Sequence, residues 1–175
     1  AFQLAAEYRL ADDPATQLKM LKLLAAAPGS RGMAGGQAID LDAVGKKLTV
    51  PELELMHIHK TGALIRASAL LGAHCGNGLD DKALERLDTF AKLIGLAFQV
   101  VDDVLDAEAP TATLGKTAGK DADRNKPTYV SALGLAQSKV FAEELRQDAL
   151  RALEGFGEAA VRLRQLADFI VRRQF

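Results

Sequence analysis

The segment that decides the fold is LIGLAFQVVDDVLD, residues 93–106. Residues 93–101 are apolar on nearly every side of a helix, with Gln99 as the polar exception. A helix that is apolar all round is buried, whereas a surface helix is apolar on one stripe only. The segment therefore predicts a helix in the middle of a helical bundle, with three aspartates at its C-terminal end.

The composition of the chain favours the same fold class. Its 175 residues can form one domain with a sizeable core. Ala and Leu dominate, aromatic residues make up 5%, and Trp is absent. This is a helix-forming composition. We predict one all-α domain over residues 1–175.

Charge and cysteine content narrow the function classes. The formal net charge is −1, which favours neither a nucleic-acid-binding surface nor an electrostatic membrane anchor. There is no apolar stretch of membrane-spanning length, and Cys75 has no partner for an internal disulfide. We expect a cytoplasmic protein with no nucleic-acid partner and no membrane insertion.

Capping signals predict where the other helices begin. Asp13 followed by Pro14 predicts a helix that continues to Ala27. Thr49 and Glu52 match a capping box and predict a long helix to about residue 73. Asp80 is the expected cap of the helix that contains residues 93–106.

Two further stretches have distinct patterns. GMAGGQAIDL, residues 32–41, is rich in glycine but keeps a helical apolar pattern, which predicts a helix that another backbone approaches closely. Residues 108–127 lose all periodicity, and a loop of that length suggests a functional role. Helical patterning resumes at Tyr129, breaks at residues 155–157, and continues to Arg173, where Arg172 and Arg173 favour a helix C-terminus.

The three aspartates are the first candidate functional residues. Asp102 and Asp106 share one helical face, with Asp103 beside them. Their mutual repulsion, added to the negative end of the helix dipole, favours a bound cation. Hard oxygen ligands of this kind suit Mg²⁺. The alternative interpretation is a solvated helix end.

Lysines supply an independent clue to an anion. Lys60 lies in the apolar stripe of its helix, where it requires a carboxylate or a bound anion unless its stem reaches solvent. Thr61 beside it has a second interpretation, a hydroxyl bonded to a preceding carbonyl. Lys116 and Lys126 follow the aspartates in and after the loop, which favours phosphate recognition. The residues His57, His59, His74 and Cys75 form no metal-ligand pattern, and we interpret them as structural or surface residues.

Together these segments resemble the trans-isoprenyl diphosphate synthases, and especially bacterial farnesyl diphosphate synthases. The resemblance covers essentially the whole chain and is carried by GMAGGQAIDL (32–41), HKTGALIRA (59–67), GLAFQVVDDVLD (95–106), LGKTAGKD (114–121) and KPTY (126–129). It implies the isoprenoid synthase helical bundle, a homodimer, and the condensation of an allylic diphosphate with isopentenyl diphosphate to give farnesyl diphosphate.

The resemblance also implies roles for individual residues. Asp102, Asp103 and Asp106 match the second of two Asp-rich motifs, which together hold three Mg²⁺ ions, with Mn²⁺ as a substitute. Other residues match family positions that contact the diphosphate, surround the allylic cation or line the neighbouring wall. They are Lys60, Thr61, Phe98, Gln99, Lys116, Lys126, Gln37 and Asp40. Asp121 matches a residue behind a metal ligand.

Two expectations concern what precedes residue 1 and what else the fold can do. Residue 1 matches a point after the helices that carry the first Asp-rich motif, so we expect these 175 residues alone to be inactive. Two alternatives to prenyl transfer remain: a terpene cyclase on the same fold, and an inactive regulatory subunit without the first motif. The DDVLD and LGKTAGKD segments are both of the transferase kind, which disfavours the cyclase.

Overall fold

The structure is a computed structural model that describes residues 2–76, 78–108 and 126–173. Its regular elements within these ranges are all helical, as predicted. In chain order they are α1 (Phe2–Glu7), α2 (Pro14–Ala26), α3 (Met33–Asp42), α4 (Val50–His57), the π-helical turn η1 (Ile58–Gly62), α5 (Ala63–Cys75), α6 (Asp81–Glu108), α8 (Tyr129–Leu133), α9 (Leu135–Ala152), the 3-10 turn η2 (Gly157–Ala160) and α10 (Val161–Arg172).

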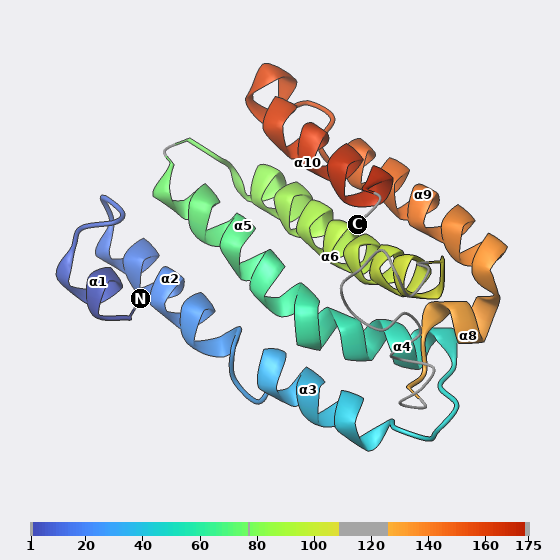
Figure 1. Ribbon diagram of the computed structural model, residues 1–175. Coiled ribbons are helices and arrows are strands. Elements are labelled where there is room, and N and C mark those ends of the chain that lie inside the picture. The colour runs from blue at the N-terminus through green and yellow to red at the C-terminus, as the bar shows by residue number, and fades with distance from the viewer. Residues whose placement is uncertain (1, 77, 109–125, 174–175) are drawn as a thin grey trace.

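Helix α6 lies in the middle of the bundle, which confirms the prediction from residues 93–106 (Figure 1). It packs against α5 and η1 on one side and against α8, α9 and α10 on the other. Helices α2 and α3 contact α5 and η1 from outside. The order of layers is therefore α1–α3, then α4–α5, then α6, then α8–α10.

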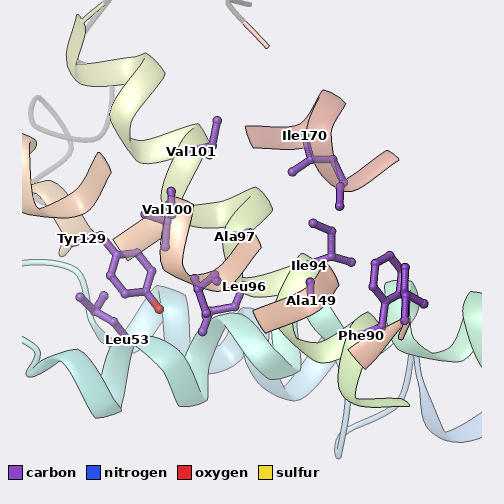
Figure 2. Close-up of a cluster of buried hydrophobic side chains, with 14 of the residues drawn as sticks. Leu53, Phe90, Ile94, Leu96, Ala97, Val100, Val101, Tyr129, Ala149 and Ile170 are labelled. Atoms are coloured by element: carbon purple, nitrogen blue, oxygen red, sulfur yellow. The ribbon is translucent and has the colours of Figure 1, made fainter. Parts of the chain in front are cut away.

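The core runs along α6. Figure 2 shows Phe90, Ile94, Ala97 and Val100 of α6 among side chains from neighbouring helices, including Ala149 of α9. The four α6 side chains are each at most 2% exposed. Burying a side chain of the size of Phe or Ile stabilises a fold by roughly 1.5–3 kcal/mol. The helix that carries the aspartates is thus the best-anchored element of the bundle.

The predicted helix starts are confirmed by their hydrogen bonds. The Asp13 carboxylate accepts from the backbone N–H groups of Ala15 and Thr16 at 3.1 and 3.0 Å. The Glu52 carboxylate accepts from the Thr49 N–H at 2.7 Å, closing the capping box. Asp80 accepts from the backbone N–H three residues later at 2.7 Å. Each cap satisfies N–H groups that have no partner within their own helix.

The helix boundaries differ from the predicted ones in two places. The helix from Val50 reaches Cys75, but Ile58–Gly62 forms a π-turn inside it. The pattern after Tyr129 was expected to be continuous to residue 155, which is wrong at Gly134. This glycine has φ 82° and separates α8 from α9. A positive φ is tolerated by glycine without a steric penalty.

Most of the predicted functional loop, residues 108–127, cannot be compared with the structure, because residues 109–125 lie outside the described residues. Among the described helices, none combines the length and the hydropathy that crossing a membrane would require.

Candidate functional site

The π-turn η1 positions two of the predicted site residues, Lys60 and Thr61. A π-turn inserts one extra residue into an α-helix, and such turns occur often at functional sites. Here it lies at the level where α3 and α6 both contact the helix. The local sequence gives no direct signal for the inserted residue, and a continuous helix was predicted across this turn.

Glycines bring the three helices together at this turn. A Cβ atom on Gly36 would lie 2.1 Å from the backbone nitrogen of Lys60, and one on Gly95 would lie 3.2 Å from the Cα of Gly62. The first distance is far below any contact that a real side chain makes, so the approach of α3 requires glycine. The prediction that another backbone approaches residues 32–41 is confirmed.

The first part of the site is the lysine side, which we define as Asp40, Lys60 and Lys126. One oxygen of Asp40, Oδ2, accepts from Lys60 Nζ at 2.8 Å and from Lys126 Nζ at 2.9 Å. Asp40 is only 4% exposed. Burial alone would raise the pKa of this carboxyl, but the hydrogen bonds and charges of the two lysines outweigh it and lower the pKa below its usual value. Two lysines on one carboxylate leave a surplus of one positive charge.

Thr61 and Gln99 form the link to α6. The Thr61 hydroxyl donates to Gln99 Oε1 at 2.7 Å. The alternative expectation, a hydroxyl bonded to a preceding carbonyl, is therefore wrong for Thr61. The contact places two polar groups beside each other, with Gln99 in the apolar part of α6 and three residues before Asp102.

Gln37 is the one described member of the predicted wall that stays apart. It precedes Asp40 by three residues on α3, and its side chain is exposed. Within the described part of the chain, no hydrogen bond of its side chain to the lysine side is found. Lys116 and Asp121 lie outside the described residues.

The second part of the site is the aspartate side, which we define as Asp102, Asp103 and Asp106 at the end of α6. Asp103 is 6% exposed, and its Oδ2 accepts from the backbone N–H of Tyr129 at 2.8 Å. Asp103 thus tethers the first turn of α8. Asp102 and Asp106 occupy the more exposed face of the same helix end. The three aspartates were predicted together, but the structure divides them between two directions.

The donor set of Asp102 and Asp106 fits Mg²⁺. That ion is commonly held by one or two carboxylates, with water and substrate phosphates completing the octahedron. The described residues contain no group of three or more His, Cys, Asp and Glu placed around one point. The metal role of the aspartates stays a prediction.

Arg173 contacts the aspartate side, although its sequence pattern did not predict a place at the site. It was expected only to favour the end of its helix, yet Nη2 contacts Asp102 Oδ1 at 2.7 Å and the Phe98 carbonyl oxygen at 3.4 Å. The guanidinium carbon lies 4.2 Å from the centre of the Phe98 ring, a cation–π geometry. No local signal could have revealed this contact, because 71 residues separate the ion pair in the sequence.

His57 packs directly behind the lysine side. It is 5% exposed and stacks on Tyr129 with 5.5 Å between ring centres. Burial, helped by the positive charge of Lys60, lowers the pKa of His57 to about 4. Neither ring nitrogen has a hydrogen-bond partner among the described residues. His57 is therefore a buried neutral histidine, which agrees with its predicted structural role.

Comparison with known proteins gives consistent relatives. The polyprenyl synthetase family model matches residues 1–157. The farnesyl diphosphate synthase of Escherichia coli is 47% identical over 160 residues, which are 90% of this chain and 54% of that protein. Geranylgeranyl pyrophosphate synthase 7 of Arabidopsis thaliana is 44% identical over 165 residues, 92% of this chain and 47% of that protein.

Solved structures agree on the fold. The apo FPP/GFPP synthase of Zymomonas mobilis has a TM-score of 0.82 at 35% identity, covering 97% of this chain and 56% of that one. The geranyltransferase of Helicobacter pylori, solved with magnesium and isoprenyl diphosphate, has a TM-score of 0.78 at 29% identity, covering 97% of this chain and 55% of that one. The chain spans about half the length of the curated relatives it matches. The family match over residues 1–157, the identities and the shared all-α fold together place this chain in the polyprenyl synthetase family.

Proposed function

We propose that the complete protein is a Mg²⁺-dependent prenyltransferase that condenses an allylic diphosphate with isopentenyl diphosphate and releases farnesyl diphosphate. The observation that carries the proposal is the pairing of a cation-rich side with a carboxylate-rich side, joined through α6. A diphosphate with its metal ions is complementary to both sides. The Helicobacter pylori geranyltransferase, a relative in fold, was solved with this ligand class.

The residues of the lysine side would bind the diphosphate. Lys60 and Lys126 are 27% and 20% exposed at their side chains, so they are desolvated but reachable. Asp40 holds both ammonium groups in place before the substrate arrives, and the surplus positive charge then attracts the anion. Fixed charges in a poorly hydrated site stabilise developing charge better than water does.

The reaction begins with departure of the diphosphate. The allylic C–O bond breaks with its electron pair going to the diphosphate oxygen, the double bond of isopentenyl diphosphate attacks the allylic carbon, and a proton leaves the new chain. Bound at Asp102 and Asp106, Mg²⁺ would neutralise the leaving diphosphate. The oxygens of Thr61 and Gln99 supply negative partial charge beside the place proposed for the allylic cation, and Phe98 supplies an apolar wall.

The test is an elongation assay of the protein as its full gene encodes it. Geranyl diphosphate, labelled isopentenyl diphosphate and Mg²⁺ are supplied, and the products are separated by chain length. We expect a C15 diphosphate, and we expect Lys60→Met and Asp102→Asn each to lower kcat/KM by about 10²-fold or more. Lys82→Met is the matched control, because Lys82 is exposed in the first turn of α6, far along the helix from the aspartates.

Other products would redirect the proposal. A C20 diphosphate would keep the reaction and replace the farnesyl product, since both product lengths are named among the relatives. Release of a hydrocarbon would replace prenyl transfer by cyclisation. A folded protein with no elongation in Mg²⁺ would overturn the proposed activity.

A further inference from the structure

The contact between Arg173 and Asp102 joins the end of α10 to the candidate metal face of α6. Arg173 is the first residue after α10, in an extended conformation with φ −61° and ψ 150°. Its side chain is 13% exposed, whereas that of Asp102 is 53% exposed. The arginine is thus held by protein, and the carboxylate it contacts remains open to solvent.

The ion pair with Asp102 uses few of the hydrogen-bond donors of Arg173. Only Nη2 contacts Asp102, and the same nitrogen also contacts the Phe98 carbonyl. Arg173 Nε is buried and has no acceptor within the described residues. A guanidinium binds a carboxylate most strongly through two parallel hydrogen bonds. A one-nitrogen pair that leaves a buried donor unsatisfied is readily exchanged for a better partner.

Arg173 and a divalent cation compete for the same carboxylate. A guanidinium on Oδ1 of Asp102 supplies the positive charge that the repelling aspartates require, and it repels a second cation at this face. We propose that Arg173 is a positioning residue that occupies Asp102 as a stand-in cation, so that a divalent ion binds there weakly until a diphosphate brings compensating negative charge. The inference rests on the proposed metal role of Asp102.

Such a contact favours binding of metal and substrate together. With Arg173 in contact with Asp102, a free divalent ion binds this carboxylate less favourably than it would bind an unpaired one. An incoming diphosphate offers the guanidinium a richer set of acceptors and offers the ion oxygen ligands at the same moment. Bare metal binding is therefore suppressed without loss of the metal–diphosphate complex.

The experiment measures Mn²⁺ binding by electron paramagnetic resonance, without substrate, on the protein as its full gene encodes it. The variants are Arg173→Gln, Arg173→Lys, Asp102→Asn and the matched control Arg172→Gln, in which the exposed neighbour loses the same charge. We expect Arg173→Gln to bind Mn²⁺ about fivefold more tightly, the equivalent of one half-exposed ion pair. Arg172→Gln should stay within about twofold of the parent, which is the range expected for a surface charge.

The remaining variants separate the possible failures. Arg173→Lys keeps the charge but loses the flat contact with Phe98, so parent-like affinity is expected; affinity as tight as in Arg173→Gln would overturn the proposal. Equal Mn²⁺ affinities for Arg173→Gln and Arg172→Gln would also overturn the proposal about Arg173. In that case, loss of Mn²⁺ binding in Asp102→Asn would still support Asp102 as a metal ligand. If Asp102→Asn binds as the parent does, the metal site and the inference both fall. Thermal unfolding of each variant verifies that it is folded.

Discussion

The lysine side and the aspartate side differ in how their charged groups are paired. On the lysine side, one nearly buried carboxylate serves two lysines, and all three groups are locked by hydrogen bonds of 2.8 and 2.9 Å. On the aspartate side, three carboxylates crowd one helix end. One of them holds a backbone N–H, and another meets an arginine through a single nitrogen.

The difference teaches which part of the site is built in advance. The lysine side is assembled by backbone packing at Gly36 and by a buried ion triad, so its cations are fixed before any ligand binds. The aspartate side keeps Asp102 and Asp106 on the more exposed face at the negative end of α6, the longest of the described helices, an arrangement that becomes favourable when a cation arrives. Three measurements probe this contrast, in order of decreasing expected effect.

Gly36→Ala should break the lysine side. The added Cβ would meet the Lys60 backbone nitrogen at 2.1 Å and its Cα at 2.4 Å, so two helix backbones must separate. We expect a loss of about 3 kcal/mol or more in the free energy of unfolding, at the upper end for overpacking. Urea titration measures it.

Gly72→Ala is the matched control for that substitution. Gly72 lies exposed in α5, and a Cβ there meets nothing within 4 Å. Replacing glycine by alanine at such a helical position stabilises by up to about 1 kcal/mol. Equal behaviour of the two variants would contradict the close-packing role of Gly36.

His57 should make the lysine side sensitive to mild acid. Its pKa is about 4 in the folded protein and 6.5 as a free side chain, so the unfolded chain binds more protons between these values. The stability is complete above pH 6.5 and is lost as the pH falls, by roughly 2–3 kcal/mol at pH 4.5. Ending the measurements at pH 4.5 avoids protonation of Asp40, because the pKa of this carboxyl is lowered from its usual 3.8. Urea unfolding at each pH measures the loss.

Two histidine variants isolate this group. His57→Phe keeps a flat ring against Tyr129 and should remove most of the slope between pH 6.5 and 4.5. His59→Gln removes the less buried histidine two residues away in η1 and is the matched control for the loss of an imidazole. An unchanged slope in His57→Phe would show that the acid sensitivity arises elsewhere.

Asp103→Ala and Asp102→Ala should separate the two directions of the aspartate side. The first leaves the buried Tyr129 N–H without its acceptor, and we expect a loss of about 1.5 kcal/mol. The second removes a half-exposed ion pair and relieves repulsion, so we expect a change within about 0.5 kcal/mol. The same urea titration applies, and equal losses would rule out the division of roles.

Several features of the site could be predicted from sequence because they follow from local rules. The burial of α6 follows from its apolar surface, the sharing of one face by Asp102 and Asp106 follows from helical spacing, and the need of Lys60 for an anionic neighbour follows from its apolar stripe. The glycines of residues 32–41 predicted that another backbone approaches this helix closely, but they did not identify that backbone.

Other features depend on residues far apart in the chain. That Lys60 and Lys126 share Asp40, that Thr61 donates to Gln99, and that Asp103 turns away to hold α8 are all contacts across 20 or more residues. Spacing along a single helix carries no information about such partners.

The sequence by itself determined that this chain is an all-α bundle with a central helix ending in carboxylates, and its motifs indicated the family. These properties depend on side-chain periodicity, capping and composition, which act over a few residues. The tertiary structure alone decided the π-turn at Lys60, the break at Gly134 and the contact of Arg173 with Asp102. The physical reason is that these features depend on how separate helices pack together, which the periodicity of a single helix does not specify.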